Sequence, residues 1–171
     1  AAFPIFRGSA VDARLAYVVP GSVKTALREA DRASAPNTRL MTVPGQLFSW
    51  FDWGNTVSPP LPALTRRPVL TRSVVRWAPA ASSQLQATVD DQLQQGRMVP
   101  GQLLPLLRLM GVGALLVATD GRRGQTDETD PATLATQLDR ALAQLQPDRV
   151  DGTGRLFLPA PGLGGRARVL P

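Results

Sequence analysis

Residues 48–55, FSWFDWGN, place four aromatic and two polar side chains with binding chemistry in one short stretch. The flat faces of such rings stack on sugar rings or nucleobases. The neighbouring carboxylate and amide offer hydrogen bonds to the hydroxyl groups of a sugar. The stretch therefore predicts a glycan-binding site made of Trp50, Asp52, Trp53 and Asn55.

Packing is the competing interpretation of the same stretch. Large aromatic side chains stabilise a protein mainly through burial, and Gly54 predicts a turn between them. The prolines at positions 59, 60, 62 and 68 stiffen the chain that follows. We therefore expect residues 46–68 to form a long aromatic and proline-rich loop after the second strand. Its first role is to pack over the sheet, at the edge where α/β folds open their binding crevices.

Catalytic and metal-binding chemistry finds little support in the composition. The chain contains no cysteine and no histidine, which excludes cysteine-based zinc sites, thiol catalysis and Ser-His-Asp triads. Asp90 and Asp91 are adjacent on a predicted helix, so their side chains diverge. Asp127, Glu128 and Asp130 crowd the start of another predicted helix, where negative charge is stabilising without any metal. We expect no catalytic residue, no metal site and no cofactor.

Length and charge limit the domain organisation and the ligands that this chain can have. The 171 residues, of which 43% are hydrophobic and 19% charged, suit a single globular domain. The formal net charge of +6 allows a stand-alone basic module that binds a polyanion, either nucleic acid or an anionic lipid or glycan. Because the arginines are scattered and form no long run, an ordinary solvated surface is the simpler interpretation. No stretch of about 20 apolar residues predicts a membrane span.

The hydrophobic pattern alternates between the two kinds of secondary structure. Strands are expected at residues 15–19, 39–43, 69–77, 111–118, 155–158 and 167–170. Helices are expected at 22–33, 83–95, 101–110 and 131–146, and Ser83 is the expected capping residue of the second helix. The leucine-rich helix at 101–110 is apolar nearly all round, which predicts burial. This order predicts an α/β fold, a three-layer domain with a mostly parallel sheet of about four to six strands flanked by helices. Residues 1–171 form this one domain, with 150–171 as edge strands or the start of a following domain.

Five short motifs follow one another along the chain. They are FPIFRG at residues 3–8, YVVP at 17–20, RLMTVPG at 39–45, WGNT at 53–56 and LMGVGALLV at 109–117. The ordered set resembles the soluble region of the actinobacterial α-(1→3)-arabinofuranosyltransferases, which are membrane glycosyltransferases of the GT-C type. The resemblance covers residues 3–120.

The resemblance implies a function and a location. The parent enzyme would transfer arabinofuranose from a polyprenyl-phosphate donor to a cell-wall arabinan acceptor, outside the cytoplasmic membrane. This chain would be a membrane-proximal, extracytoplasmic fragment of that enzyme, with the transmembrane remainder of the same polypeptide as its partner. Its expected role is to position the acceptor glycan or to support the membrane catalytic part, and nucleic acid is not favoured as a partner. In GT-C enzymes the catalytic carboxylate lies in a loop between early transmembrane helices, so no catalytic residue is carried over.

Overall fold

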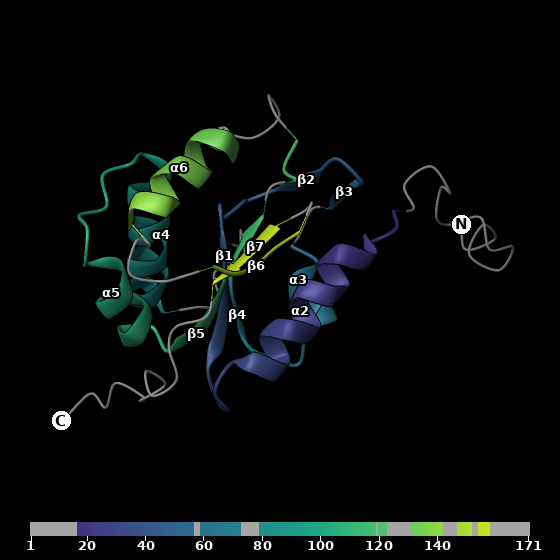
Figure 1. Cartoon of the computed structure of the whole chain (residues 1–171), viewed down its shortest axis with the longest axis horizontal. Coiled ribbons are helices and arrows are strands. Elements are labelled where there is room, and N and C mark those ends of the chain that lie inside the picture. Colours follow the sequence, from purple (N-terminus) through teal and green to yellow (C-terminus); the bar gives the residue numbers. More distant parts are fainter. Residues whose placement is uncertain are drawn as a thin grey trace, which may run out of the picture.

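The computed structural model describes residues 17–56, 59–72, 79–118, 120–122, 131–141, 147–151 and 154–157. Its helices are α2 (Gly21–Ala33), α3 (Leu61–Leu64), α4 (Ala80–Gln94), α5 (Leu103–Leu109) and α6 (Pro131–Ala141). Its strands are β1 (Arg39–Val43), β2 (Ser49–Phe51), β3 (Gly54–Thr56), β4 (Val69–Leu70), β5 (Val112–Ala118), β6 (Pro147–Asp151) and β7 (Gly154–Phe157). Helices cover both faces of the central sheet, with α2 and α3 on one side and α4, α5 and α6 on the other (Figure 1). The predicted three-layer α/β domain is confirmed.

The main sheet has five strands in the order β4-β1-β5-β7-β6. β4, β1 and β5 run parallel, whereas β7 pairs antiparallel with both β5 and β6. The parallel part is therefore three strands, fewer than predicted. The reason is that β6 and β7 are separated by only two residues, a connection that permits only an antiparallel pair.

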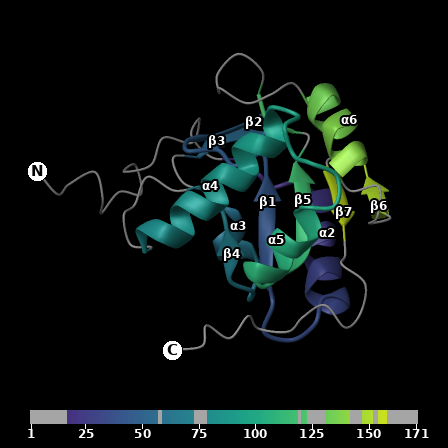
Figure 2. The same ribbon diagram turned by 90° about the vertical axis from the view of Figure 1, so that its left-hand side faces the viewer.

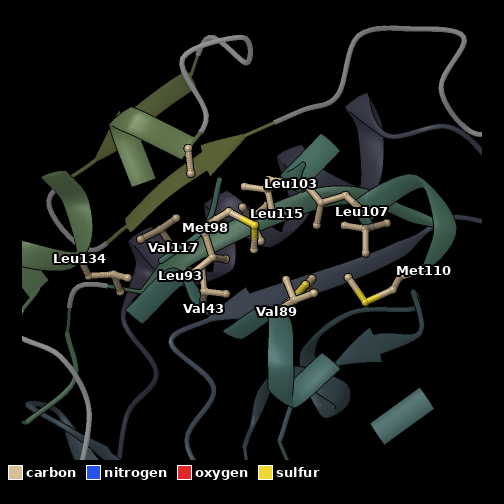
Figure 3. Packing of buried hydrophobic residues seen from close by; sticks show 13 residues of the cluster. Val43, Val89, Leu93, Met98, Leu103, Leu107, Met110, Leu115, Val117 and Leu134 are labelled. Atoms are coloured by element: carbon tan, nitrogen blue, oxygen red, sulfur yellow. The ribbon is translucent and has the colours of Figure 1, made fainter. Parts of the chain in front are cut away.

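Two hydrophobic cores lie on opposite faces of the parallel strands, because successive side chains of a strand point to opposite faces. Leu40 and Leu116 pack with α2 and α3, whereas Met41 and Leu115 pack with α4, α5 and α6. Figure 3 shows how side chains of this second core converge from the helices onto β1 and β5. The prediction that residues 111–118 form a strand apolar on both faces is confirmed by β5.

Helix α5 departs from its prediction. Leu103 and Leu107 are fully buried, but Leu109 is 56% exposed and Leu104 and Leu106 are only partly buried. A helix in the outer layer of a three-layer domain buries one stripe against the sheet. In the part of the chain that the structure describes, nothing covers the opposite stripe of α5. The prediction that this helix is buried nearly all round is therefore wrong.

Element boundaries show three further differences. Residues 17–19, the described part of the strand predicted at 15–19, form no strand, and Tyr17 packs against Trp53. Helix α4 begins at Ala80, directly after Pro79, and not at the predicted capping residue Ser83. The segment predicted as a loop at 46–68 contains the β2–β3 hairpin and the one-turn helix α3. The strand expected at 167–170 and most of 150–171 lie outside the described residues.

The first testable prediction concerns the buried stripe of α5. Leu107→Ala lowers the free energy of unfolding of the chain by about 2–5 kcal/mol, because a fully buried leucine leaves a cavity in a packed core. Leu109→Ala, on the exposed side of the same helix, changes it by about 0.5 kcal/mol or less. Urea denaturation followed by circular dichroism measures both. Equal losses for the two variants would contradict the one-sided packing of α5.

Candidate functional site

The aromatic stretch forms a hairpin at the carboxyl edge of the parallel strands. β2 and β3 are antiparallel, with Trp50 opposite Asn55 and Ser49 opposite Thr56. The two faces of the hairpin differ, because Ser49 and Thr56 are buried whereas Asn55 is exposed and Trp50 only partly buried. Trp50 and Asn55 therefore share an outer face, as cross-strand partners do.

Backbone hydrogen bonds attach the hairpin to the chain that leaves β5. The Asp52 N–H donates to the Asp120 carbonyl at 2.9 Å, and the Arg122 N–H donates to the Trp50 carbonyl at 2.9 Å. These bonds flank an antiparallel bridge between Phe51 and Gly121. Residues 120–122 thus extend the hairpin by one short strand, and the end of β5 determines where the hairpin lies.

Trp53 belongs to the inner side of this arrangement. Its indole Nε1–H donates to the Asp120 carboxylate at 2.6 Å. Its ring stacks on Phe51 with centroids 4.4 Å apart and planes 7° apart, and Tyr17 packs at 5.6 Å in a tilted orientation. A Cβ on Gly54 would lie 2.5 Å from the Tyr17 Cβ, so this close approach requires glycine. The side chain of Trp53 is thus fixed by contacts within the protein, and its first role is packing.

A cavity of about 30 Å³ lies beneath the hairpin. It is lined by Val23, Ala26, Phe51, Trp53, Pro60, Leu61, Leu116, Ala118 and Asp120. Because one water molecule needs about 10–15 Å³ by this measure, the cavity is far too small for a sugar ring. A glycan contact at this edge must therefore use the outer face of the hairpin.

The outer face retains three of the four predicted site residues. Asp52 at the turn and Asn55 on β3 are exposed, and Trp50, opposite Asn55, is partly exposed. Phe48, just before β2, is 53% exposed and adds a second aromatic surface. The buried Gln46 fixes this strand, since its side-chain oxygen accepts a hydrogen bond from the Trp50 N–H at 2.9 Å. Trp50 and Asn55 share one side of the hairpin and Asp52 lies exposed in its turn, whereas Trp53, also partly buried, packs on Phe51.

A second carboxylate lies buried at the end of β1. Both oxygens of Asp90 accept the Gly45 N–H, at 3.0 and 3.1 Å, and one accepts a hydrogen bond from Gln94 at 2.9 Å. Burial raises the pKa of Asp90 above its ordinary value of 3.8, and these hydrogen bonds and the charge of Arg72 offset this only in part. Asp91 points outward and forms a 3.6 Å ion pair with Arg72. The predicted divergence of Asp90 and Asp91 is confirmed, and Asp90 ties α4 to the end of β1.

Sequence reasoning missed Asp120 and Gln46 as parts of this edge. The only available signal for Asp120 was its position two residues after a buried strand, where polar groups of α/β folds gather. Gln46 carried no comparable signal. In the described parts of the chain, no group of three or more acidic residues is arranged to hold a metal ion.

Comparison with known proteins places this architecture in a family. Residues 9–150 match the family described as alpha-(1->3)-arabinofuranosyltransferase, N-terminal GT-C domain. The chain belongs to this family. The resemblance seen in the ordered sequence motifs is thereby confirmed, and the match covers most of the chain.

Solved structures of the arabinofuranosyltransferase AftD from mycobacteria share the fold. One cryo-EM structure aligns with a TM-score of 0.68 and 21% identity over 91% of this chain. A structure of an arginine-to-serine mutant, class 1, aligns with a TM-score of 0.66 and 21% identity over 82% of this chain. In both comparisons this arabinofuranosyltransferase-family chain corresponds to 13% of the solved chain. No curated protein matches it.

None of the helices formed by the described residues is long and apolar enough to cross a membrane.

The buried carboxylate of Asp90 yields a pH-dependent prediction. The folded chain binds the Asp90 proton more tightly than the unfolded chain does, so this group lowers the stability as pH rises from 3.8 through its raised folded pKa. Asp90→Asn keeps an acceptor for Gly45 and removes the titration. The stability of the variant relative to wild type should therefore increase with pH across this window and then level off. Urea denaturation of both proteins in steps from pH 3.5 to 7.5 measures it; a constant difference would contradict the assignment.

The contact between Asp120 and Trp53 yields another prediction. Asp120→Ala lowers the free energy of unfolding by about 1–3 kcal/mol, because it leaves a partly buried indole N–H without its acceptor. The exposed Asp52 provides the matched control, and Asp52→Ala changes stability by about 0.5 kcal/mol or less. Adding Trp53→Phe to Asp120→Ala removes the orphaned donor, so the double variant should lose less than the sum of the two single losses. Additive losses would show that the two side chains are not coupled.

Proposed function

We propose that this chain is an extracytoplasmic α/β domain of a membrane arabinofuranosyltransferase and that it positions the arabinan acceptor. The observation that carries the proposal is the outer face of the β2–β3 hairpin, where partly exposed Trp50 lies beside exposed Asp52 and Asn55. This face stands at the carboxyl edge of the parallel strands, where α/β domains commonly bind ligands. Family membership supplies the class of ligand.

The chemistry of this outer face suits a neutral sugar. A furanose ring presents C–H groups that pack on an aromatic face and hydroxyl groups that need hydrogen-bond partners. Trp50 and Phe48 offer aromatic surface, Asp52 accepts hydrogen bonds, and Asn55 both donates and accepts them. A shallow platform of this kind fits part of an extended glycan, whereas the small cavity beneath Trp53 fits none.

The role proposed is binding and orientation, and no residue of this chain is assigned to catalysis. Both buried carboxylates already hold structural partners, Asp90 with Gly45 and Asp120 with Trp53. A general acid or base must reach the reacting atoms of a bound substrate, and neither group faces the outer side of the hairpin. The transfer step itself belongs to other parts of the enzyme under this proposal.

The experiment is a titration of the ¹⁵N-labelled chain with an arabinofuranose oligosaccharide at up to millimolar concentration. The chain has three tryptophans, so its indole N–H signals report each ring separately. The Trp50 signal is expected to shift with saturation, and the Trp53 signal to move less because its N–H is already bonded to Asp120. Trp50→Ala should weaken binding by about thirtyfold, the equivalent of losing a central aromatic contact of about 2 kcal/mol.

Two controls make the result specific. Leu109→Ala removes an exposed apolar side chain on α5 and should leave the affinity unchanged. Asn55→Ala should weaken it by about tenfold, since one hydrogen bond to the sugar is lost. If no indole signal shifts at millimolar ligand, or if Trp50→Ala binds as wild type does, the glycan-positioning role is wrong.

A further inference from the structure

A groove runs between α4 and α5, on the helical layer that faces the viewer in Figure 2 and away from the α2 layer. Its volume is about 430 Å³, within the range of about 300–1,000 Å³ typical of binding pockets. The residues that line it are Leu85, Thr88, Val89, Gln92, Gly101, Gln102, Pro105 and Leu106.

The lining of this groove is apolar and uncharged. Its polar members are one hydroxyl, Thr88, and two carboxamides, Gln92 and Gln102. Leu109, which is 56% exposed, lies one helical turn after the groove residues Pro105 and Leu106 on α5, and Val99 before α5 is 53% exposed. Contiguous exposed apolar surface with a few polar groups is typical of a protein-protein contact.

The charge of this chain and the length of related proteins indicate what occupies the groove. The formal net charge of +6 opposes pairing of two copies of this chain, since like charges repel. The uncharged lining provides no partner for an anionic ligand. The AftD structures that share this fold are far longer, and this chain corresponds to only 13% of them. A domain embedded in a polypeptide of that length needs a surface that contacts the rest.

We propose that the α4–α5 groove docks an apolar-faced helix from the remainder of the transferase polypeptide. A helix laid between two others presents side chains at positions i, i+3, i+4 and i+7 to such a groove. Leu85, Leu106 and Leu109 supply the apolar contacts, and Gln92 and Gln102 bond to polar groups at its border. This docking goes beyond glycan binding, because it uses a different face and none of the hairpin residues.

Cysteine labelling tests the proposal cleanly, because this chain contains no cysteine. Leu109→Cys reports the groove, and Lys24→Cys on the exposed side of α2 is the matched control. Each is prepared in the 171-residue chain and in the intact transferase polypeptide that contains it. Maleimide modification is followed by peptide mass spectrometry, so that cysteines elsewhere in the intact polypeptide do not interfere. We expect comparable rates at the two positions in the short chain, and labelling of Leu109→Cys slowed tenfold or more in the intact polypeptide with Lys24→Cys unchanged.

Any other labelling result overturns the proposal. Unslowed labelling of Leu109→Cys in the intact polypeptide shows that the groove stays open. If Leu109→Cys is labelled slowly already in the short chain, the groove is covered without the rest of the polypeptide. A doubled mass by light scattering then shows that a second copy covers it, and a monomer mass shows that residues of the same chain do. A benzophenone attached to the same cysteine identifies the occupant in the intact polypeptide. A crosslink within that polypeptide supports the proposal, and a crosslink to lipid or to another protein contradicts it. Glycan shifts at Trp50 are independent of all these results.

Discussion

Burial of β1 and β5 on both faces is the constraint on which the rest of the structure depends. Parallel strands of this kind need a layer of helices on each side, and the two cores provide it. β5 is apolar throughout and β1 carries only Arg39 and Thr42 as polar residues, so other polar groups lie beyond the ends of the strands. Gly45 follows β1 and Asp120 follows β5, so the edge that carries the hairpin is a consequence of how the core of the domain is built.

Two buried carboxylates organise that edge in similar ways. Asp90 reaches from α4 to the Gly45 N–H, and Asp120 receives the Trp53 indole. Each compensates for its burial with hydrogen bonds from a segment distant in sequence, which is how buried acidic groups are tolerated. The surface that we propose for ligands carries the aromatic side chains of Phe48 and Trp50 together with the exposed Asp52 and Asn55. Such a surface suits the glycan-positioning role that we propose for this member of an arabinofuranosyltransferase family.

Prediction from the sequence succeeded where the pattern is local. The helix at 22–33 and the strand at 39–43 correspond to α2 and β1, and the strand at 111–118 corresponds to β5. Prediction failed where the boundary of a helix or the burial of a side chain depends on residues far away in the sequence. Ser83 looked like a helix cap, yet α4 begins directly after Pro79, three residues earlier. The α5 leucines looked uniformly buried, but which of them face the sheet depends on where the helix docks.

The sequence by itself determined the apolar strands, the helical stripes, the lack of histidine and cysteine, and the ordered motifs of the family. Only the tertiary structure decided how the aromatic stretch is used. Trp50 and Trp53 are three residues apart and both partly buried, yet Trp50 lies on the outer side of the hairpin whereas Trp53 packs against Phe51 and Tyr17. The physical reason is a partner 67 residues away, Asp120, whose carboxylate binds the Trp53 indole. A local pattern shows which side chains can be buried, whereas a long-range contact decides which of them are.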